Sequence, residues 1–528
     1  MHTVFALPLY SELVFQQYPL FAKPCRPIYN RENMKTANIP FITLDAKHHS
    51  APLYRQIYEA VRRSILIGEL TRGAKVPGSR MLAKELGVSR MTVVNAYDQL
   101  FAEGYLEGKT GAGTYVASTL PEAMLRVDVL SSPQRKAIAK PGDHTLSRRG
   151  KWLASTSITK LRVQPDGNNY AFQNGVPALD EFPFKVWSQL ASRRWRNPPR
   201  ELLGYGDPAG YRPLRETIAA HLRSTRAVQC DADQVIIVAG SQQAVDLTAR
   251  ILLDPDDVVW VEDPCYPGAR NALLAAGAKV VSIPVDDEGF DLATALQRSG
   301  KARLVYVTPS HQFPLGVTMS LSRRLMLLEW ARRSGALIIE DDYNSEFRYA
   351  GRPLASLQGL DDDGRVIYVG TFSKTIFPSL RLGCIVVPKG LIEAFTAARA
   401  LVDRHSPSLD QAMLADFIDE GHFTRHIRKM RSLYAERQHV LVEAAQKYLP
   451  GLLEVAPAAA GMHLVGWLPS KISDRAASEK AASCGVEAAP LSAYSANLLQ
   501  RGGLVLGYAA VNAQQIKTGV RRLAQALS

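Results

Sequence analysis

The sequence lacks the features of a secreted or membrane protein. Its cysteines are odd in number and scattered, so neither a disulfide framework nor a metal site is expected; they are Cys25, Cys230, Cys265, Cys384 and Cys484. No apolar run approaches the length that crosses a bilayer. The first ten residues contain no Lys or Arg, which argues against a signal peptide. We therefore expect a cytoplasmic protein with reduced thiols.

Positive charge is concentrated at the front of the chain. Of the formal net charge of +13, +11 lies before residue 166, and the remainder is nearly neutral. A chain of 528 residues is also too long for one hydrophobic core, so two or three domains are expected. A basic front end on a neutral globule predicts a polyanionic partner for the front alone. The alternative for residues 121–165 is a solvated charged linker.

Residues 1–40 show no convincing hydrophobic period and are interpreted as an extension, either a leader or a disordered segment. Recognisable patterning begins just after Met34. We hypothesise that Met34 is the natural start. A natively expressed product whose intact mass begins at Met1 would refute this.

Residues 41–118 predict a winged helix-turn-helix domain. A helix with apolar residues at helical spacing is followed by two short helices, which Ser79 and Ser89 are expected to cap, with Gly87 supplying the turn between them. The last helix has apolar residues spaced i, i+3, i+4 and i+7, namely Val93, Ala96, Tyr97 and Leu100. Its polar first turn would enter a major groove, and KTGAGTYVAS would form a wing along the phosphates.

Residues 50–117 resemble the GntR-family winged helix, which implies double-stranded operator DNA as a partner. Helix pairs are often only structural, but here helix, turn, recognition helix and wing follow in order. Val94 stands where some relatives carry a further arginine, so base reading is not expected there. The resemblance implies DNA contacts from these residues: Arg80, Ser89, Arg90, Thr92, Lys109, Gly111 and Thr114.

Residues 119–165 are rich in Ser, Pro, Lys and Arg and have no sustained apolar period. This composition predicts a basic, flexible linker. Arg148, Arg149 and Lys151 could add non-specific phosphate contacts, or their charge could simply be solvated.

Residues 166–528 predict an α/β domain, because short apolar strands alternate with helical stretches. The sheet is expected to be mainly parallel, with functional groups at strand ends. The strands are expected within 235–240, 258–263, 303–309, 336–342 and 366–372.

The turn GTFSKTIFPSLRLG places Lys374 directly after a buried strand. A lysine whose pKa is lowered by burial can form a Schiff base with an aldehyde. Ser373 and Arg381 on either side could hold a phosphate. This combination predicts pyridoxal 5'-phosphate (PLP) as the cofactor, although a Lys beside a Ser is common by chance.

Three further turns support this prediction. Backbone N–H groups of Ser241 and Gln242 open a helix and could bind the phosphate. Tyr266 follows a strand and could stack on the cofactor ring, or be an ordinary packed tyrosine. At another strand end, Asp341 could pair with the pyridine nitrogen and Tyr343 with the phenolic oxygen, though acidic residues there are often helix caps.

These turns occur in the order seen in fold type I aminotransferases, which this region resembles. The resemblance implies a smaller C-terminal α/β subdomain, and a role for Tyr205 at the phosphate of a partner subunit. HQFPLG resembles the loop that usually reads NPTG, with Phe313 in place of an asparagine. His311 or Gln312 could compensate, or Tyr343 could act alone.

Residues 50–528 together resemble the MocR/GabR-type transcription regulators. The resemblance implies a PLP-dependent, DNA-binding homodimer, usually head-to-tail, that senses PLP or a PLP–amine adduct. Aminotransferases hold a substrate carboxylate with an arginine in the strand that here reads GGLVLGYAAV, and Arg501 lies just before it. The missing arginine favours a regulator of vitamin B6 synthesis that senses PLP itself.

Two other functions remain open from the sequence. One is an aminotransferase with an accessory DNA-binding module; the missing arginine and the DNA-reading module favour the regulator, with at most a residual half-reaction. The other is a regulator that has lost its cofactor, against which intact Lys374, Asp341 and Arg381 argue.

Overall fold

The computed structural model describes residues 42, 44, 51–109, 112–121, 146–156, 171–351 and 354–528. The chain divides into two compact units, residues 1–143 and residues 144–528. No helix in these described ranges is long and apolar enough to cross a membrane.

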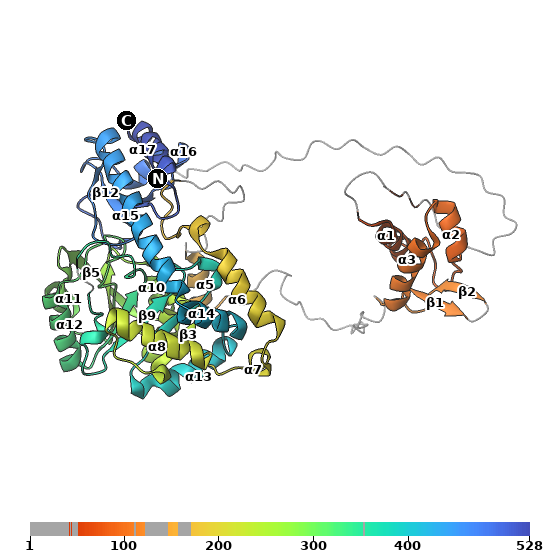
Figure 1. Ribbon diagram of the computed structural model, residues 1–528, viewed down its shortest axis with the longest axis horizontal. Helices are drawn as coiled ribbons and strands as arrows, with labels where there is room; N and C mark the ends of the chain where they lie inside the picture. Colours follow the sequence, from red (N-terminus) through yellow and green to blue (C-terminus); the bar gives the residue numbers. More distant parts are fainter. Residues whose placement is uncertain are drawn as a thin grey trace, which may run out of the picture. The chain divides into compact units, whose positions relative to one another are not determined.

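The N-terminal unit is the expected winged helix (Figure 1). Helix α3 packs against both α1 and α2, and β1 and β2 form an antiparallel hairpin that pairs Leu106 with Val116. Ile57, Val61 and Val93 are fully buried in its core. The elements are α1 Leu53–Leu66, α2 Ser79–Leu86, α3 Arg90–Ala102, β1 Leu106–Lys109 and β2 Gly113–Val116.

The two expected helix caps have different outcomes. Ser89 caps α3, because its hydroxyl accepts a hydrogen bond of 3.1 Å from the Thr92 backbone N–H. The prediction for Ser79 is wrong: Ser79 is already the first helical residue of α2, and the capping position is occupied by Gly78, which has no side chain to cap with. Gly87 takes the left-handed conformation, φ 66°, that the turn between the helices requires.

Replacing Ser89 with alanine should loosen the start of α3. Loss of a Ser cap costs about 1 kcal/mol, which corresponds to roughly fivefold faster exchange of amides that open locally. Hydrogen–deuterium exchange of α3 peptides in the full chain would measure this. Ser79→Ala is the matched control and should leave the exchange of α2 peptides nearly unchanged. Equal effects of the two substitutions would contradict the assignment of the cap.

The C-terminal unit is built on an eight-stranded sheet of order β3-β10-β9-β8-β7-β4-β5-β6. Strands β5, β4, β7, β8 and β9 are parallel, while β6 and β10 run opposite to their neighbours, which confirms a mainly parallel sheet. The strands are β3 Val235–Val238, β4 Val258–Asp263, β5 Lys279–Asp286, β6 Gly289–Phe290, β7 Leu304–Val307, β8 Leu337–Asp342, β9 Val366–Thr371 and β10 Gly383–Val386.

Helices cover both faces of this sheet. In β3, Ile236 and Val238 belong to a core shared with α9, α10 and α13, whereas Val235 and Ile237 contact the opposite core with α8, α14 and α15. This alternation follows from the twofold period of a strand. The helices are α6 Phe184–Arg196, α7 Arg200–Leu203, α8 Arg212–Arg226, α9 Ser241–Leu252, α10 Pro267–Ala275, α11 Leu292–Ser299, α12 Leu321–Ser334, α13 Ile392–Asp403, α14 Ser408–Asp419 and α15 His422–Tyr448.

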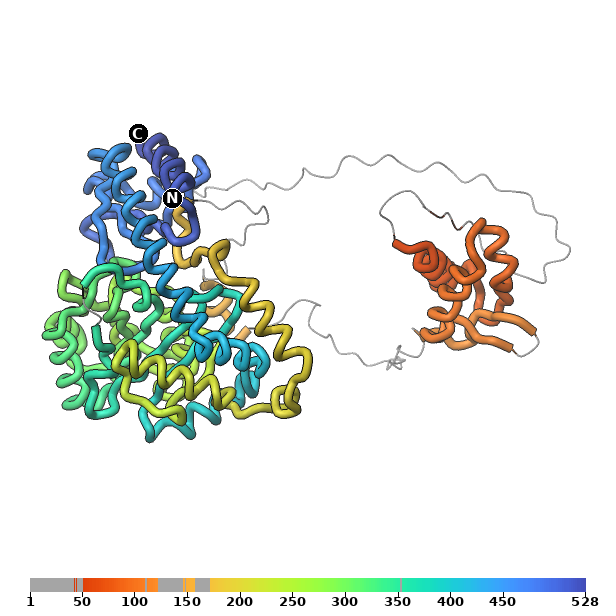
Figure 2. Tube along the Cα trace, in the orientation of Figure 1, coloured from red at the N-terminus to blue at the C-terminus, as the bar shows by residue number. Residues whose placement is uncertain are grey.

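A smaller C-terminal subdomain follows, as expected. Its antiparallel sheet has the order β11-β12-β14-β13, and α15 runs from the central sheet to this subdomain (Figure 2). The elements are β11 Glu454–Val455, β12 His463–Trp467, α16 Asp474–Ser483, β13 Ala489–Pro490, β14 Gly503–Gly507 and α17 Ala513–Leu527. Single 3-10 turns are η2 Leu179–Glu181, η3 Ala232–Gln234, η4 Gln358–Leu360, η5 Pro378–Leu380, η6 Lys389–Leu391 and η7 Leu491–Ala493.

One helix lies within the stretch predicted to be a flexible linker. Helix α5, Arg148–Ser155, begins after Ser147, whose hydroxyl accepts a hydrogen bond of 3.0 Å from the Gly150 N–H. It lies against α10 of the same unit, and Arg149 and Lys151 are exposed. The composition of the segment gave no sign of this helix. The rest of the linker prediction, and that for residues 1–40, falls largely outside the described residues.

Candidate functional site

Polar side chains converge at one edge of the central sheet. Asp341 lies at the carboxyl end of β8, Lys374 follows β9, and Tyr266 follows β4 at the start of α10. These three strands are parallel, so their carboxyl ends lie at the same edge. Burial raises the pKa of Tyr266, Asp341 raises it further and Arg381 opposes, which places both charges near this ring.

Lys374 is held as a buried amine. Its Nζ donates a hydrogen bond of 2.7 Å to the carbonyl oxygen of Gly175. Burial lowers its pKa; Asp341 opposes this and Arg381 adds to it. A Cβ on Gly175 would lie 2.9 Å from Nζ, and Gly175 has a φ of +80°, so glycine is strongly favoured there. A lysine in this state is more readily deprotonated and nucleophilic.

Two buried oxygens near Lys374 have no hydrogen-bond partner among the described residues. Asp341 accepts a bond of 2.7 Å from the Tyr306 hydroxyl at Oδ2, but its Oδ1 is unpartnered. The Tyr343 hydroxyl is likewise unpartnered. Buried polar atoms without partners are costly. A ring carrying an N–H and a phenolic oxygen would satisfy both.

Asp341 should make the stability of the cofactor-free protein depend on pH. Burial is the main cause that raises the pKa of Asp341 from 3.8 to about 7. The stability that the protonated Asp341 contributes is therefore fully present below about pH 4 and is lost as the pH rises through 7. Asp341→Asn cannot ionise. Above pH 7 it should therefore be more stable than the wild type, by at most roughly 4 kcal/mol.

Tryptophan fluorescence during urea unfolding would measure this effect, because all six tryptophans lie in the C-terminal unit. The exposed Asp287→Asn is the control and should follow the wild-type pH profile. A variant profile parallel to that of the wild type between pH 4 and 7 would refute the buried, protonated Asp341.

An anion could be bound at the start of α9. Gly240 precedes the helix with a φ of +107°, and Ser241 and Gln242 are its first residues, whose N–H groups have no acceptor within the helix. Arg381 Nη2 donates to the Ala239 carbonyl, and a Cβ on Gly240 would lie 3.3 Å from the same nitrogen. The structure thus brings the guanidinium to the helix N-terminus, an arrangement suited to phosphate.

The remaining candidates around the anion site are less specific. The Gln242 side chain donates a hydrogen bond of 3.0 Å to the Gly268 carbonyl, and its Oε1 is buried without a partner. Ser373 is half-buried, and its backbone N–H donates to the Thr371 hydroxyl at 3.2 Å. These contacts leave the roles of Gln242 and Ser373 as predictions.

Gln312 is not free to replace the missing asparagine. Gln312 Nε2 already donates to the carbonyls of Pro264 and Phe313, at 2.7 and 2.8 Å. His311 is buried beside Gly461, where a Cβ would lie 2.4 Å from its Nε2, and burial lowers its pKa to about 3. Of the three alternatives, the geometry argues against Gln312, while His311 Nε2 and the Tyr343 hydroxyl are both buried without a partner among the described residues.

Two residues do not enter the site of this chain. Tyr205 is 85% exposed and stacks with Arg404, whose guanidinium carbon lies 5.0 Å from the ring centroid. Arg501 donates to the Leu468 carbonyl at 2.8 Å and pairs with Glu454 at 2.9 Å. The arginine before β14 is therefore engaged elsewhere, and Tyr205 is available to another molecule.

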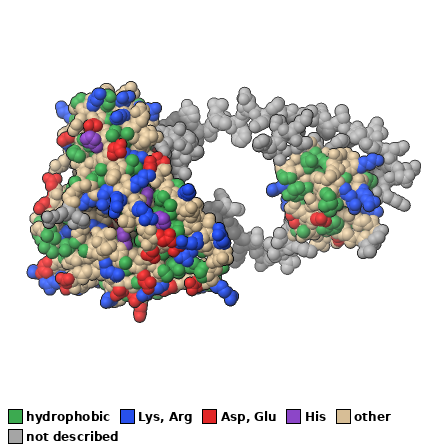
Figure 3. Space-filling view, in the orientation of Figure 1, with side chains coloured by type: hydrophobic (Ala, Val, Ile, Leu, Met, Phe, Trp, Pro, Cys, Tyr) green, Lys and Arg blue, Asp and Glu red, His purple; other side chains and the backbone are tan. Residues whose placement is uncertain are grey.

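The DNA-contact candidates lie on the N-terminal unit. Arg80 and Arg90 are exposed in the first turns of α2 and α3, and Lys109 is exposed at the end of β1. The hydroxyls of Ser89 and Thr92 bond each other at 2.8 Å. Lys and Arg side chains gather on one side of this unit, over α2 and β2 (Figure 3). Thr114 lies half-buried on β2, and Gly111 lies outside the described residues.

The motifs did not identify Tyr306, which donates to Asp341, or Gly175, whose carbonyl accepts from Lys374. Tyr306 lies in the predicted strand RLVYVTP. The only sequence pattern that could have indicated its role is that its side chain points to the opposite face of the sheet from those of Val305 and Val307. Gly175 lies outside all the motifs, and no local pattern indicates that its carbonyl meets Lys374.

Comparison with known protein families agrees with both units. Residues 53–116 match "Bacterial regulatory proteins, gntR family", and residues 168–523 match "Aminotransferase class I and II".

Individual relatives match almost the whole chain. The chain is 42% identical to the probable rhizopine catabolism regulatory protein MocR of Rhizobium meliloti, over 90% of this chain and 94% of that one. It is 30% identical to the pyridoxine biosynthesis transcriptional regulator PdxR of Corynebacterium glutamicum, over 91% and 97%. The structure also resembles Thermus thermophilus LysN, an α-aminoadipate aminotransferase complexed with N-(5'-phosphopyridoxyl)-L-leucine, with a TM-score of 0.63 and 30% identity over 67% and 91% of the two chains.

Proposed function

The chain belongs to the MocR-type transcriptional regulators, which join a GntR-type helix-turn-helix domain to an aminotransferase-like domain with PLP as cofactor, and from this premise we propose how it works. The N-terminal unit binds operator DNA in the cytoplasm. The C-terminal unit senses PLP, or an amine joined to PLP, and alters DNA binding accordingly. Turnover of a substrate is not its physiological role.

The observation that carries this proposal is the set of unsatisfied groups around Lys374. Asp341 Oδ1 and the Tyr343 hydroxyl are buried and unpartnered among the described residues, and Arg381 lies at the N-terminus of α9. PLP has a ring nitrogen, a phenolic oxygen and a phosphate that match these three groups. Bound there, it supplies an electrophilic carbon that captures amines and a ring that withdraws electrons.

Each side chain then has a defined task. Lys374 provides the amine that bonds the cofactor, and Asp341 keeps the ring nitrogen protonated. Tyr343 donates to the phenolic oxygen, and Tyr266 packs against the ring. The phosphate is bound by Arg381, by Ser373 and by the N–H groups of Ser241 and Gln242. Tyr205 of a second subunit also reaches this phosphate.

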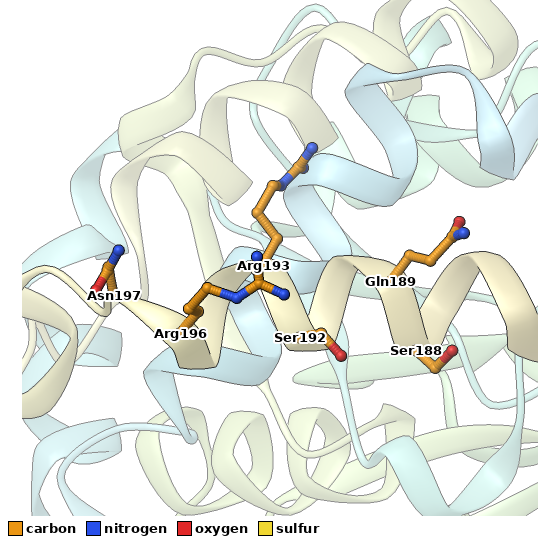
Figure 4. Close-up of a pocket in the computed structure, with 6 residues that line it drawn as sticks. All are labelled: Ser188, Gln189, Ser192, Arg193, Arg196 and Asn197. Atoms are coloured by element: carbon orange, nitrogen blue, oxygen red, sulfur yellow. The ribbon is translucent and has the colours of Figure 1, made fainter.

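Exposed apolar side chains support a homodimer. Trp195, Leu203 and Leu401 are 62%, 61% and 88% exposed, and exposed apolar residues that share one surface region can mark an interface. Tyr205 lies beside Arg404, just after α13, so these residues share one region. A surface hollow along α6 adds a polar rim (Figure 4); its lining residues are Ser188, Gln189, Ser192, Arg193, Arg196 and Asn197. We propose a head-to-tail dimer through this face.

The effector would act by shifting a population of conformations. A ligand biases the DNA-binding arrangement only by the difference between its affinities for the two arrangements. DNA contact is proposed for Arg80, Arg90 and the wing residues Lys109, Gly111 and Thr114, with Ser89 and Thr92 at the start of α3.

The test is binding of the purified full chain to DNA from upstream of its own and neighbouring genes, before and after addition of PLP and then of candidate amines. We expect sequence-preferring binding that changes when PLP or an amine is added. Binding that stays non-specific, or that ignores both ligands, would refute the proposal. Steady turnover with an amino donor and a keto acid would favour the aminotransferase instead.

A further inference from the structure

Phe313 is the centre of a cluster of aromatic rings beside the cofactor residues. Four rings surround it edge-on or nearly so, and they come from both the central sheet and the C-terminal subdomain. Their centroids lie 5.3 to 6.1 Å from that of Phe313, and we name the set with Phe313 the ring wall: Tyr266, Tyr343, His463 and Tyr494.

The ring wall adjoins Lys374. Burial and the charge of Lys374 lower the pKa of His463 to about 4, opposed by its contact with the Pro314 carbonyl. The Tyr494 hydroxyl interacts with Asn174, the residue before the glycine whose carbonyl receives Lys374. A ligand joined to the cofactor at the position of Lys374 would therefore meet these rings.

The part of the wall contributed by the C-terminal subdomain is held firmly in place. The Tyr494 carbonyl accepts a hydrogen bond of 3.0 Å from the Cys265 N–H. The next three residues donate to the carboxylate of Asp263 through the Ser495 hydroxyl, the N–H groups of Ala496 and Asn497, and the Asn497 side chain, at 2.9, 2.8, 3.3 and 2.6 Å. The ring wall is thus preorganised and does not need to be ordered by a ligand.

Four of the basic groups near this wall are not available to a carboxylate. His311 and His463 are uncharged at neutral pH, since burial lowers the pKa of each, to about 3 and about 4. Arg348 donates to the Ala350 carbonyl and the Thr318 hydroxyl, and Arg501 is paired with Glu454. Burying a carboxylate without a partner is costly, whereas apolar groups gain from contact with rings.

We propose that the ring wall selects primary amines with an apolar body and no carboxylate as the ligands that join the cofactor. This rests on the proposed PLP site. In the exchange, a bond forms between the ligand nitrogen and the cofactor carbon while the bond from that carbon to Lys374 Nζ breaks. Two protons pass from the ligand nitrogen to Nζ, and nothing is oxidised or reduced.

Matched ligands can test the selection on the PLP-loaded full chain. Phenethylamine and L-phenylalanine differ only in the carboxylate, and ethanolamine replaces the apolar body with a small polar one. The visible absorption spectrum and the melting temperature report binding at equilibrium. We expect phenethylamine to act at concentrations at least tenfold below those of either other compound. Equal or tighter binding of L-phenylalanine, or of ethanolamine, would overturn the proposal.

Substitutions in the ring wall test whether its rings cause this ligand preference. Phe313→Leu and Tyr494→Leu keep an apolar side chain but remove a ring, and each should reduce the preference for phenethylamine over ethanolamine severalfold. Phe101→Leu, an exposed ring on α3 of the N-terminal unit, should keep it. An unchanged preference in both wall variants would overturn the role of the rings. A protein with no cofactor absorption before any amine is added would overturn the proposed PLP site itself, and this inference with it.

Discussion

Lys374→Ala should abolish the covalent retention of PLP. Lys374 is the amine that lies beside Asp341 and Arg381, and its pKa is lowered by burial, so no other described lysine has the same combination of neighbours. After reduction with borohydride, the wild type should carry one phosphopyridoxyl group per chain and the variant none. Intact mass and peptide mapping measure this directly.

The control for this loss is Lys389→Ala, which removes a lysine whose side chain is 78% exposed and pairs only with Asp231 among the described residues. It should be labelled to the same extent as the wild type. Labelling of Lys374→Ala at another lysine, or an unlabelled wild type, would contradict the assignment.

Arg90→Ala should produce the second large effect, a weakening of operator binding by at least tenfold with loss of sequence preference. Arg90 is exposed in the first turn of α3, the part of a recognition helix that reaches base edges. Truncating an arginine that contacts a base costs about 1–3 kcal/mol and relaxes specificity at that position. Fluorescence anisotropy with operator and scrambled DNA, at several salt concentrations, would measure both effects.

Arg63→Ala is the control that distinguishes a specific contact of Arg90 with DNA from the loss of one positive charge. Arg63 lies exposed in the last turn of α1 and is not among the predicted DNA contacts. Its removal changes the net charge equally, but should weaken binding to operator and scrambled DNA only slightly and to the same extent. If both variants lost the same affinity on both DNAs, binding would be electrostatic and the recognition role of α3 would be wrong.

The sequence was informative wherever local pattern and chain order were sufficient. The strands ending near Asp341 and Lys374 are short apolar runs followed by polar turns, so the parallel sheet and its functional edge could be inferred before any coordinates. The cap at Ser89 was predictable because the helix begins directly after it. The cap at Ser79 was not, because α2 begins at Ser79 itself, one residue earlier than the pattern indicates, and Gly78 occupies the capping position.

Contacts between distant parts of the chain could not be inferred. Asp263 belongs to β4, and nothing in its neighbourhood shows that it will bind the backbone of Asn497, 234 residues later. The aromatic neighbours of Phe313 are separated in the same way, since His463 and Tyr494 come from the C-terminal subdomain. Such contacts depend on how the C-terminal subdomain packs against the central sheet. The hydrophobic period of a single strand or helix carries no information about that packing.

The hydrogen bond between Lys374 and Gly175 joins residues 199 positions apart, yet Gly175 lies almost at the start of the C-terminal unit. It precedes in the chain every residue proposed for the cofactor site. An Nζ that bonds carbon has fewer protons to donate than a free ammonium group. The Gly175 carbonyl is therefore the backbone group whose hydrogen bond would weaken when Lys374 is joined to the cofactor.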